Sequence, residues 1–160
     1  MEKDQQLLNE AQSLHSEGAE MLQNKDPRAI NKLQKALDIY NDLLCTRPNS
    51  NSLLFYAGTA MMQLGQTGAA LALLEKVAQN KPDYVPVWNN IGACHRQENR
   101  LKEALECYNK GLEIRSDDPD ILANIGAAWV NEGNPDEGLP FLRKALEKNP
   151  NHPQANWNLG

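Results

Sequence analysis

Two cysteines and a histidine are the side chains of this sequence that could support metal binding or nucleophilic catalysis. Cys94 and His95 are adjacent, and Cys107 follows thirteen positions after Cys94. Thiolates and imidazoles are the ligands that zinc prefers, and a cysteine near a histidine can be an activated nucleophile. Adjacent residues of a helix point about 100° apart, so Cys94 and His95 could not both face one ion. We expect a structural role for them, and therefore no metal, no cofactor and no catalytic residue.

Two consecutive carboxylates, Asp117 and Asp118, could perform general acid–base chemistry. They precede Pro119, however, and an aspartate followed by proline is typical of the first turn of a helix, where the carboxylate accepts from free amides. No glycine-rich phosphate loop, H-E-x-x-H or G-x-S-x-G motif occurs elsewhere. The sequence predicts that this protein is not an enzyme by itself.

The composition narrows the classes of partner. The chain has 160 residues, 41% of them hydrophobic, and its 21 acidic and 16 basic side chains give a formal net charge of −5. No run of lysine or arginine could follow a phosphate backbone, so we expect no nucleic-acid partner. The beginning is polar, and no stretch approaches the roughly 20 apolar residues of a membrane span. Three cysteines are too few for a disulfide framework, and we expect a cytoplasmic protein with no membrane partner.

A repeat of 34 residues organises the chain. Gly58, Gly92, Gly126 and Gly160 are each 34 positions apart. Other columns keep the same step: Ala70, Ala104 and Gly138; Val77, Gly111 and Ala145; Leu74, Tyr108 and Leu142; and, in the columns of the candidate thiols, Ala60, Cys94 and Ala128, and Leu73, Cys107 and Phe141. Helices that cross about 8–10 Å apart require small residues at the crossing, which explains the glycine and alanine columns.

Within each unit the apolar residues have helical spacing, as at Trp88, Ile91 and His95. Gly65, Asn99 and Gly133 lie between two such stretches and tolerate the left-handed conformation that ends a helix. The spacing therefore predicts three helix pairs, at 52–64 and 67–80, 86–98 and 101–114, and 120–132 and 135–148.

The two ends differ from the repeats. Residues 4–48 predict a longer hairpin that caps the first repeat, and residues 153–160 resemble the start of a further unit whose second helix is absent. We interpret 1–160 as one solenoid with repeats at 51–84, 85–118 and 119–152, and expect the natural protein to continue. The apolar residues Trp157 and Leu159 would then be uncovered and would favour self-association.

The columns resemble the tetratricopeptide repeat, with its pattern W-x2-L-G-x2-Y, A-x3-F and P over 34 residues. Residues 85–116 match best, through Trp88, Ile91, Gly92, Ala104 and Tyr108. The departures from the pattern are His95, Ser116 and Pro140, of which the last could bend its helix. The resemblance implies an all-α, right-handed solenoid of antiparallel helix hairpins, whose first helices line a concave groove that binds other proteins.

The predicted core and groove follow from these helices. We expect a buried core of Trp88, Ile91, His95, Ala104, Tyr108, Ile125, Trp129, Leu142 and Ala145, and expect His15 and His152, which have no evident partners, to be solvated. The predicted peptide-binding residues are Phe55, Tyr56, Met62, Asn89, Asn90, Arg96, Gln97, Asn124, Asn131 and Asn158. None of them is acidic, which suits a neutral or mildly acidic extended peptide.

Asn90, Asn124 and Asn158 form a ladder with the 34-residue step that could hold a peptide backbone, since an amide offers a donor and an acceptor. Asparagine is also common at this position of the family, so the ladder could equally be a general feature of these repeats with no role in binding.

Three functions remain open. The leading hypothesis is a protein-interaction scaffold that binds an extended peptide. The alternatives are the non-catalytic arm of a larger enzyme, such as a glycosyltransferase, and a self-assembly module. The sequence after Gly160 would separate the first two.

Overall fold

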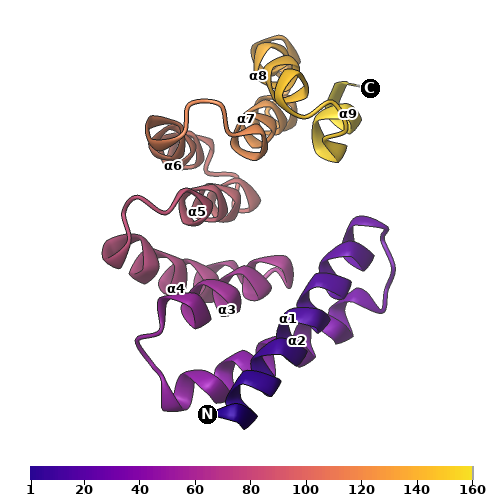
Figure 1. Cartoon of the computed structure of the whole chain (residues 1–160). Helices are drawn as coiled ribbons and strands as arrows, with labels where there is room; N and C mark the ends of the chain where they lie inside the picture. Colours follow the sequence, from indigo (N-terminus) through magenta and orange to yellow (C-terminus); the bar gives the residue numbers. More distant parts are fainter. Residues whose placement is uncertain (160) are drawn as a thin grey trace. The chain divides into compact units, whose positions relative to one another are not determined.

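A computed structural model describes residues 1–159 and shows only helices in that range (Figure 1). The chain divides into two compact units, Met1–Asn80 and a second that begins at Lys81. The first contains α1 (Glu2–Gln23), α2 (Ala29–Thr46), α3 (Asn51–Gln63) and α4 (Thr67–Asn80). The second contains α5 (Val85–Gln97), α6 (Leu101–Ile114), α7 (Pro119–Asn131), α8 (Pro135–Lys148) and α9 (Pro153–Leu159). The predicted all-α class is confirmed. The bounds of the six predicted repeat helices agree with those of α3 to α8 to within one residue. No helix of the described range is long and apolar enough to cross a membrane.

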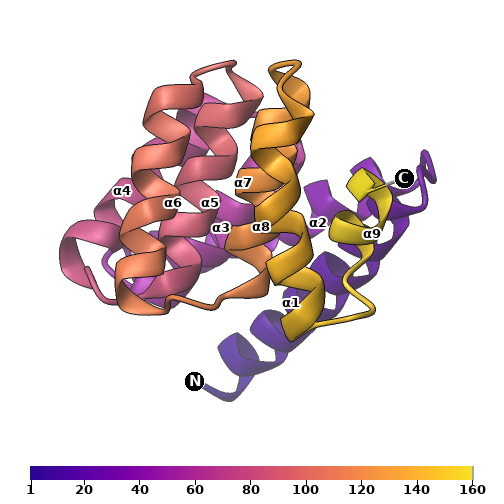
Figure 2. The same ribbon diagram turned by 90° about the horizontal axis from the view of Figure 1, so that it is seen from above.

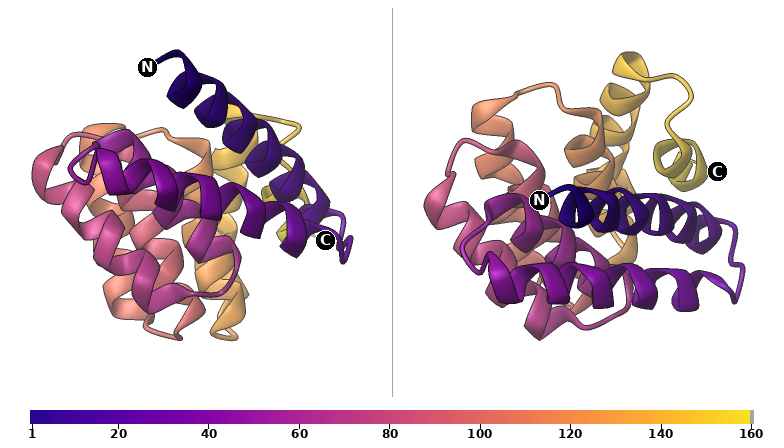
Figure 3. Two further views of the ribbon diagram at one scale, coloured as in Figure 1. Left: turned by 90° about the horizontal axis from the view of Figure 1, so that it is seen from below. Right: turned by 60° about the horizontal axis from the view of Figure 1, so that its bottom comes forward.

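Successive helices pair as antiparallel hairpins within each unit. Figure 2 shows α5 and α6, and then α7 and α8, as neighbouring hairpins of the second unit, and both views of Figure 3 show α1 lying along α2 in the first. The helix α2 also contacts α3, and α7 contacts α5, α6 and α9. Each unit is thus built from stacked hairpins. Whether the two units continue as a single solenoid remains a prediction.

The turns inside the hairpins have the predicted left-handed residue. The φ angles are 79° at Gly65, 61° at Asn99 and 80° at Gly133. In the first of these turns the amide of Gly65 donates to the carbonyl of Met62, and the amide of Gln66 donates to that of Met61 (3.0 and 2.8 Å). This pairing satisfies the last carbonyls of α3 and reverses the chain sharply.

The start of α7 confirms the predicted cap at Asp118. The Oδ1 atom of Asp118 accepts from the amides of Asp120 and Ile121, at 3.0 Å each, so this carboxylate caps α7. Asn134 occupies the same position before α8 but makes no side-chain cap bond. The predicted irregular residue Pro140 lies inside α8, which nevertheless continues to Lys148.

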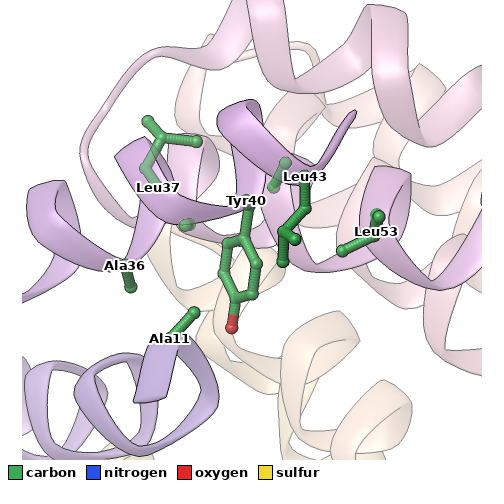
Figure 4. Close-up of a cluster of buried hydrophobic side chains, with 8 residues drawn as sticks. Ala11, Ala36, Leu37, Tyr40, Leu43 and Leu53 are labelled. Carbon is green, nitrogen blue, oxygen red and sulfur yellow. The ribbon is translucent and has the colours of Figure 1, made fainter. Parts of the chain in front are cut away.

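The core of the first unit is centred on Tyr40. Its fully buried ring extends from α2 toward Ala11 of α1, with Leu43 of α2 and Leu53 of α3 beside it (Figure 4). Ala57 and Ala60 complete the contact from α3. Three helices therefore share one core at this point.

The second unit has two clusters, one around Tyr108 and Ile125 and the other around Leu142 and Ala155. The small-residue columns permit its helices to touch. A Cβ atom on Gly138 of α8 would lie 2.6 Å from the carbonyl oxygen of Gly126 in α7, which no real side chain tolerates. Glycine at position 138 is therefore a packing requirement of this hairpin.

Most of the predicted core residues are buried, but Trp88, His95 and Trp129 are only half-buried. Trp88 remains near solvent because its indole N–H donates to the Pro82 carbonyl (2.8 Å) and the Lys110 ammonium lies 4.7 Å from the ring centroid. The Nδ1 atom of His95 is buried without a hydrogen-bond partner, which weakens the interpretation of His95 as an ordinary core residue.

Candidate functional site

A row of side-chain amides crosses the first helices of the second unit. The Nδ2 atom of Asn124 in α7 lies 2.6 Å from the Oδ1 atom of Asn89 in α5, and the Nε2 atom of Gln154 in α9 lies 3.1 Å from the Oδ1 atom of Asn124. We call Asn89, Asn124 and Gln154 the amide row. In this arrangement Asn124 donates to one neighbour and accepts from the other, so each bond joins two successive first helices.

The amide row corrects the predicted ladder. Asn124 is 8% exposed, and its side chain bonds to the flanking helices, so the prediction that it projects into open space is wrong. The Nδ2 atom of Asn158 donates to the backbone carbonyl of Gln154 in its own helix (2.8 Å). Sequence spacing identified the column of Asn90, Asn124 and Asn158. It could not show that Asn124 pairs with two residues outside the column, Asn89 and Gln154.

The remaining predicted residues of the second unit are at its surface or close to it. Gln97 and Asn131 are exposed, and Asn90 and Arg96 are half-buried. The Nε atom of Arg96 is buried without a partner. Burial raises the pKa of the nearby Tyr108 to about 12, and the Arg96 charge opposes that increase. Arg96 is therefore held against the α5–α6 hairpin.

In the first unit, Phe55 and Tyr56 lie at the border of a pocket of about 400 Å³. We call it the aromatic pocket; it is lined by Gln12, His15, Ser16, Ala19, Tyr40, Phe55, Tyr56 and Thr59. Met62, also predicted, is half-buried on the same helix α3 but does not line the pocket. The sequence therefore identified two of the lining residues.

His15 is a site residue that the sequence interpretation missed. It was expected to be solvated, but its Nδ1 atom lies 3.2 Å from the Tyr40 hydroxyl and its Nε2 atom lies 2.8 Å from Oε1 of Gln63. Because Gln63 Oε1 can only accept, Nε2 carries a proton, and in the neutral ring Nδ1 then accepts from the Tyr40 hydroxyl. Burial lowers the pKa of His15 below 6.5, partly opposed by the bond to Gln63. The partners are 25 and 48 residues away, so no local sequence signal could reveal them.

His152 was also expected to be solvated, and that expectation is wrong as well. It is 6% exposed, its Nε2 atom lies 2.7 Å from Oδ1 of Asp120, and its Nδ1 atom accepts from the amide of Ala155 (3.3 Å). His152 thus links α7 to the start of α9.

The cysteine and histidine cluster has the environment of a packed interior. Cys94 and Cys107 are buried, and burial raises the pKa of Cys94 to about 12. A thiol with so high a pKa is protonated at neutral pH and is a poor nucleophile. Within residues 1–159 no three histidine, cysteine, aspartate or glutamate side chains are grouped to hold a metal ion.

Comparison with known proteins agrees with the helical repeat. Tetratricopeptide-repeat family models match residues 52–84 and 85–118. A curated relative, "Small glutamine-rich tetratricopeptide repeat-containing protein 2" of Mycosarcoma maydis, is 26% identical over 107 residues. That alignment covers 67% of this chain and only 29% of the relative.

Solved structures share the fold. A tetratricopeptide repeat protein of Thermus thermophilus, TTC0263, superposes with a TM-score of 0.74 over 93% of this chain and 79% of its own, at 16% identity. MamA (41-end) from Desulfovibrio magneticus RS-1 gives a TM-score of 0.65 over 86% and 94% of the two chains, also at 16% identity. The repeat models, the curated relative and the solved structures lead to one conclusion: residues 52–118 of this chain are tetratricopeptide repeats, within a chain that shares the fold of these structures.

Proposed function

We propose that this protein is an interaction scaffold that binds an extended segment of another protein along its first helices. The observation that carries the proposal is the amide row, which runs across α5, α7 and α9 on one side of the second unit. Repeats of this family generally mediate protein–protein binding, and none of the predicted groove residues is acidic. A neutral or mildly acidic peptide would therefore meet no repulsion there.

The hydrogen bonds of the amide row all run in one direction, so the amides at its two ends offer different groups to a ligand. Asn89 uses its carbonyl oxygen on Asn124, so its NH₂ group would be the donor for a ligand, whereas Gln154 uses its NH₂ group and would offer its carbonyl oxygen as an acceptor. A peptide unit offers the complementary C=O and N–H. Asn124 then acts as a positioning residue that holds the two outer amides, while Asn90 and Asn158 lie beside them on the same helices.

Binding can be tested with synthetic peptides of 12 residues and an isotope-labelled chain. Three compositions serve as probes: uncharged serine, threonine and alanine; the same with aspartates; and the same with lysines. We expect the uncharged and mildly acidic peptides to shift backbone amide resonances of α5, α7 and α9 in a saturable manner. Shifts confined to α6 and α8, or no saturable shift with any composition, would refute the proposal.

Self-association through α9 is a second candidate function, because two large apolar residues of this helix are exposed to solvent. Trp157 is 79% exposed and Leu159 is 38% exposed. Two exposed large apolar side chains within three residues of one short helix favour contact with another surface. The second copy would then cover the face of α9.

A further inference from the structure

The aromatic pocket is formed by three helices of the first unit. The helix α1 contributes Gln12, His15, Ser16 and Ala19, α3 contributes Phe55, Tyr56 and Thr59, and α2 contributes the buried Tyr40. Except for Tyr40, these residues are half-buried or exposed, so the pocket opens outward and Tyr40 forms its floor. A volume of about 400 Å³ lies within the range of pockets that take small organic ligands.

Ring contacts organise the walls. The rings of Tyr40 and Tyr56 stack with centroids 5.7 Å apart and planes at 24°, and Phe55 meets Tyr56 edge to face at 6.0 Å and 60°. His15 meets Tyr40 edge to face at 5.7 Å and 64°. These rings brace one another, so the walls are preformed. A further ring could extend the same pattern of stacked and edge-to-face contacts.

The polar groups of His15, Tyr40 and Thr59 in the lining are used within the protein. Both ring nitrogens of His15 have partners, and the Thr59 hydroxyl donates to the Phe55 carbonyl (2.7 Å). No charged side chain lines the pocket. A charged ligand group would therefore lose its hydration without gaining a counter-charge, which is unfavourable, whereas a neutral aromatic group would gain apolar and ring contacts.

We propose that the aromatic pocket binds one uncharged aromatic side chain of the partner segment. This inference rests on the proposed function and adds which side chain of the partner the protein would select. At the 34-residue step, the positions of Phe55 and Tyr56 are taken by Asn89 and Asn90, and then by Ala123 and Asn124. Only one repeat therefore presents two adjacent rings, so this pocket, and not the matching position of the later repeats, would select an aromatic residue.

The probes for the pocket are four capped amino acids: N-acetyl-tryptophanamide, N-acetyl-leucinamide, N-acetyl-lysinamide and N-acetyl-aspartamide. Titrated into the labelled chain, the tryptophan probe is expected to shift amides of residues 12–19 and 55–59 and to bind about two- to tenfold more tightly than the leucine probe. The lysine and aspartate probes are expected to give no saturable shift. Equal binding of the lysine probe, or tryptophan shifts elsewhere, would overturn the inference.

Matched variants separate the pocket from the surface around it. Ala19→Leu fills the pocket and should abolish binding of the tryptophan probe, whereas Glu20→Leu adds the same side chain at the next, exposed position and should not. Phe55→Ala should weaken binding at least fivefold, and Ile30→Ala, which removes an apolar residue that is 61% exposed and outside the pocket, should leave it unchanged. If Phe55→Ala fails to fold, the comparison of Ala19→Leu with Glu20→Leu decides.

Three other outcomes have distinct meanings. If pocket resonances shift with protein concentration alone, the occupant is a second copy and the inference fails. If the 12-residue peptides bind the second unit but the tryptophan probe does not bind the pocket, the scaffold function stands and the inference fails. If the tryptophan probe binds in the pocket but no peptide binds anywhere, the scaffold function fails.

Discussion

The Nε2 atom of His15 lies 2.8 Å from the Oε1 atom of Gln63, a residue 48 positions later in the chain. This contact joins the middle of α1 to the end of α3, and the Tyr40 hydroxyl on the other ring nitrogen adds α2. One imidazole thus fastens three helices of the first unit. Burial favours the neutral ring, in which Nδ1 accepts from the Tyr40 hydroxyl.

The first prediction is that acid destabilises the first unit through His15. Burial holds the pKa of His15 in the folded state below its ordinary value of 6.5, so between these two pKa values the unfolded chain binds more protons than the folded one. The stabilising contribution is complete above pH 6.5 and is lost as the pH falls through the folded-state pKa. Urea unfolding monitored by α1–α3 resonances at pH 7.5 and 5 should show this loss.

The control for this prediction is His15→Gln, which keeps a polar side chain but does not titrate. Its free energy of unfolding should be lower than that of the natural chain at pH 7.5 and should depend less on pH. A variant that keeps the full pH dependence would assign the effect to other groups.

The second prediction concerns the contact between α7 and α8. Gly138→Ala would place a methyl group 2.6 Å from the carbonyl oxygen of Gly126 and 3.2 Å from Cβ of Trp129, so the helices must separate. Overpacking of this kind costs about 1–3 kcal/mol of the free energy of unfolding. Gly68→Ala, in α4, meets nothing within 4 Å and should be neutral or stabilising by up to about 1 kcal/mol. Equal effects in thermal unfolding would contradict the close contact.

The third prediction compares two helix starts. Asp118→Ala removes the carboxylate that accepts from two amides of α7 and should cost about 0.5–2 kcal/mol. Asn134→Ala, at the matching position before α8, removes no side-chain cap bond and should have a smaller effect. Chemical denaturation of both variants measures the difference, and a larger loss for Asn134→Ala would be the contrary result.

The success of the sequence interpretation has a local cause. The columns of Gly58, Gly92 and Gly126 and the turn residues Gly65, Asn99 and Gly133 report steric requirements of adjacent helices, so helix limits and turn geometry followed directly from spacing. The sequence therefore predicted the hairpins almost residue by residue.

The candidate site was harder to predict from the sequence, because it depends on pairing between side chains that are far apart in the chain. Asn124 was expected to be open, but Asn89 and Gln154 approach it from 35 and 30 residues away. His15 and His152 were expected to be solvated for the same reason: their side-chain partners lie 25 and 48 residues away for His15 and 32 residues away for His152. Helical periodicity shows which face of a helix a residue occupies, but it does not show which side chain of the next helix meets it.

The fourth prediction tests self-association through α9. Trp157→Ala removes a side chain that is 79% exposed, and should lower the weighted-average mass in sedimentation equilibrium if α9 forms a contact between copies. Tyr84→Ala serves as the control, because Tyr84 is an exposed aromatic residue outside α9. Equal masses for the natural chain and Trp157→Ala at all concentrations would reject this contact.

The fifth prediction separates positioning by Asn124 from direct peptide binding. Asn124→Ala removes two hydrogen bonds between helices and should lower the stability of the second unit by about 1–3 kcal/mol, because each such bond contributes about 0.5–1.5 kcal/mol. Asn131→Ala, on the exposed part of the same helix, should change stability by no more than about 0.5 kcal/mol. Urea unfolding measures both, and titration with the uncharged 12-residue peptide measures binding.

Asn89→Ala should weaken that binding while keeping the bond between Asn124 and Gln154. If Asn124→Ala leaves stability unchanged and still weakens binding, Asn124 contacts the peptide itself and the amide row is not what holds α5, α7 and α9 in register.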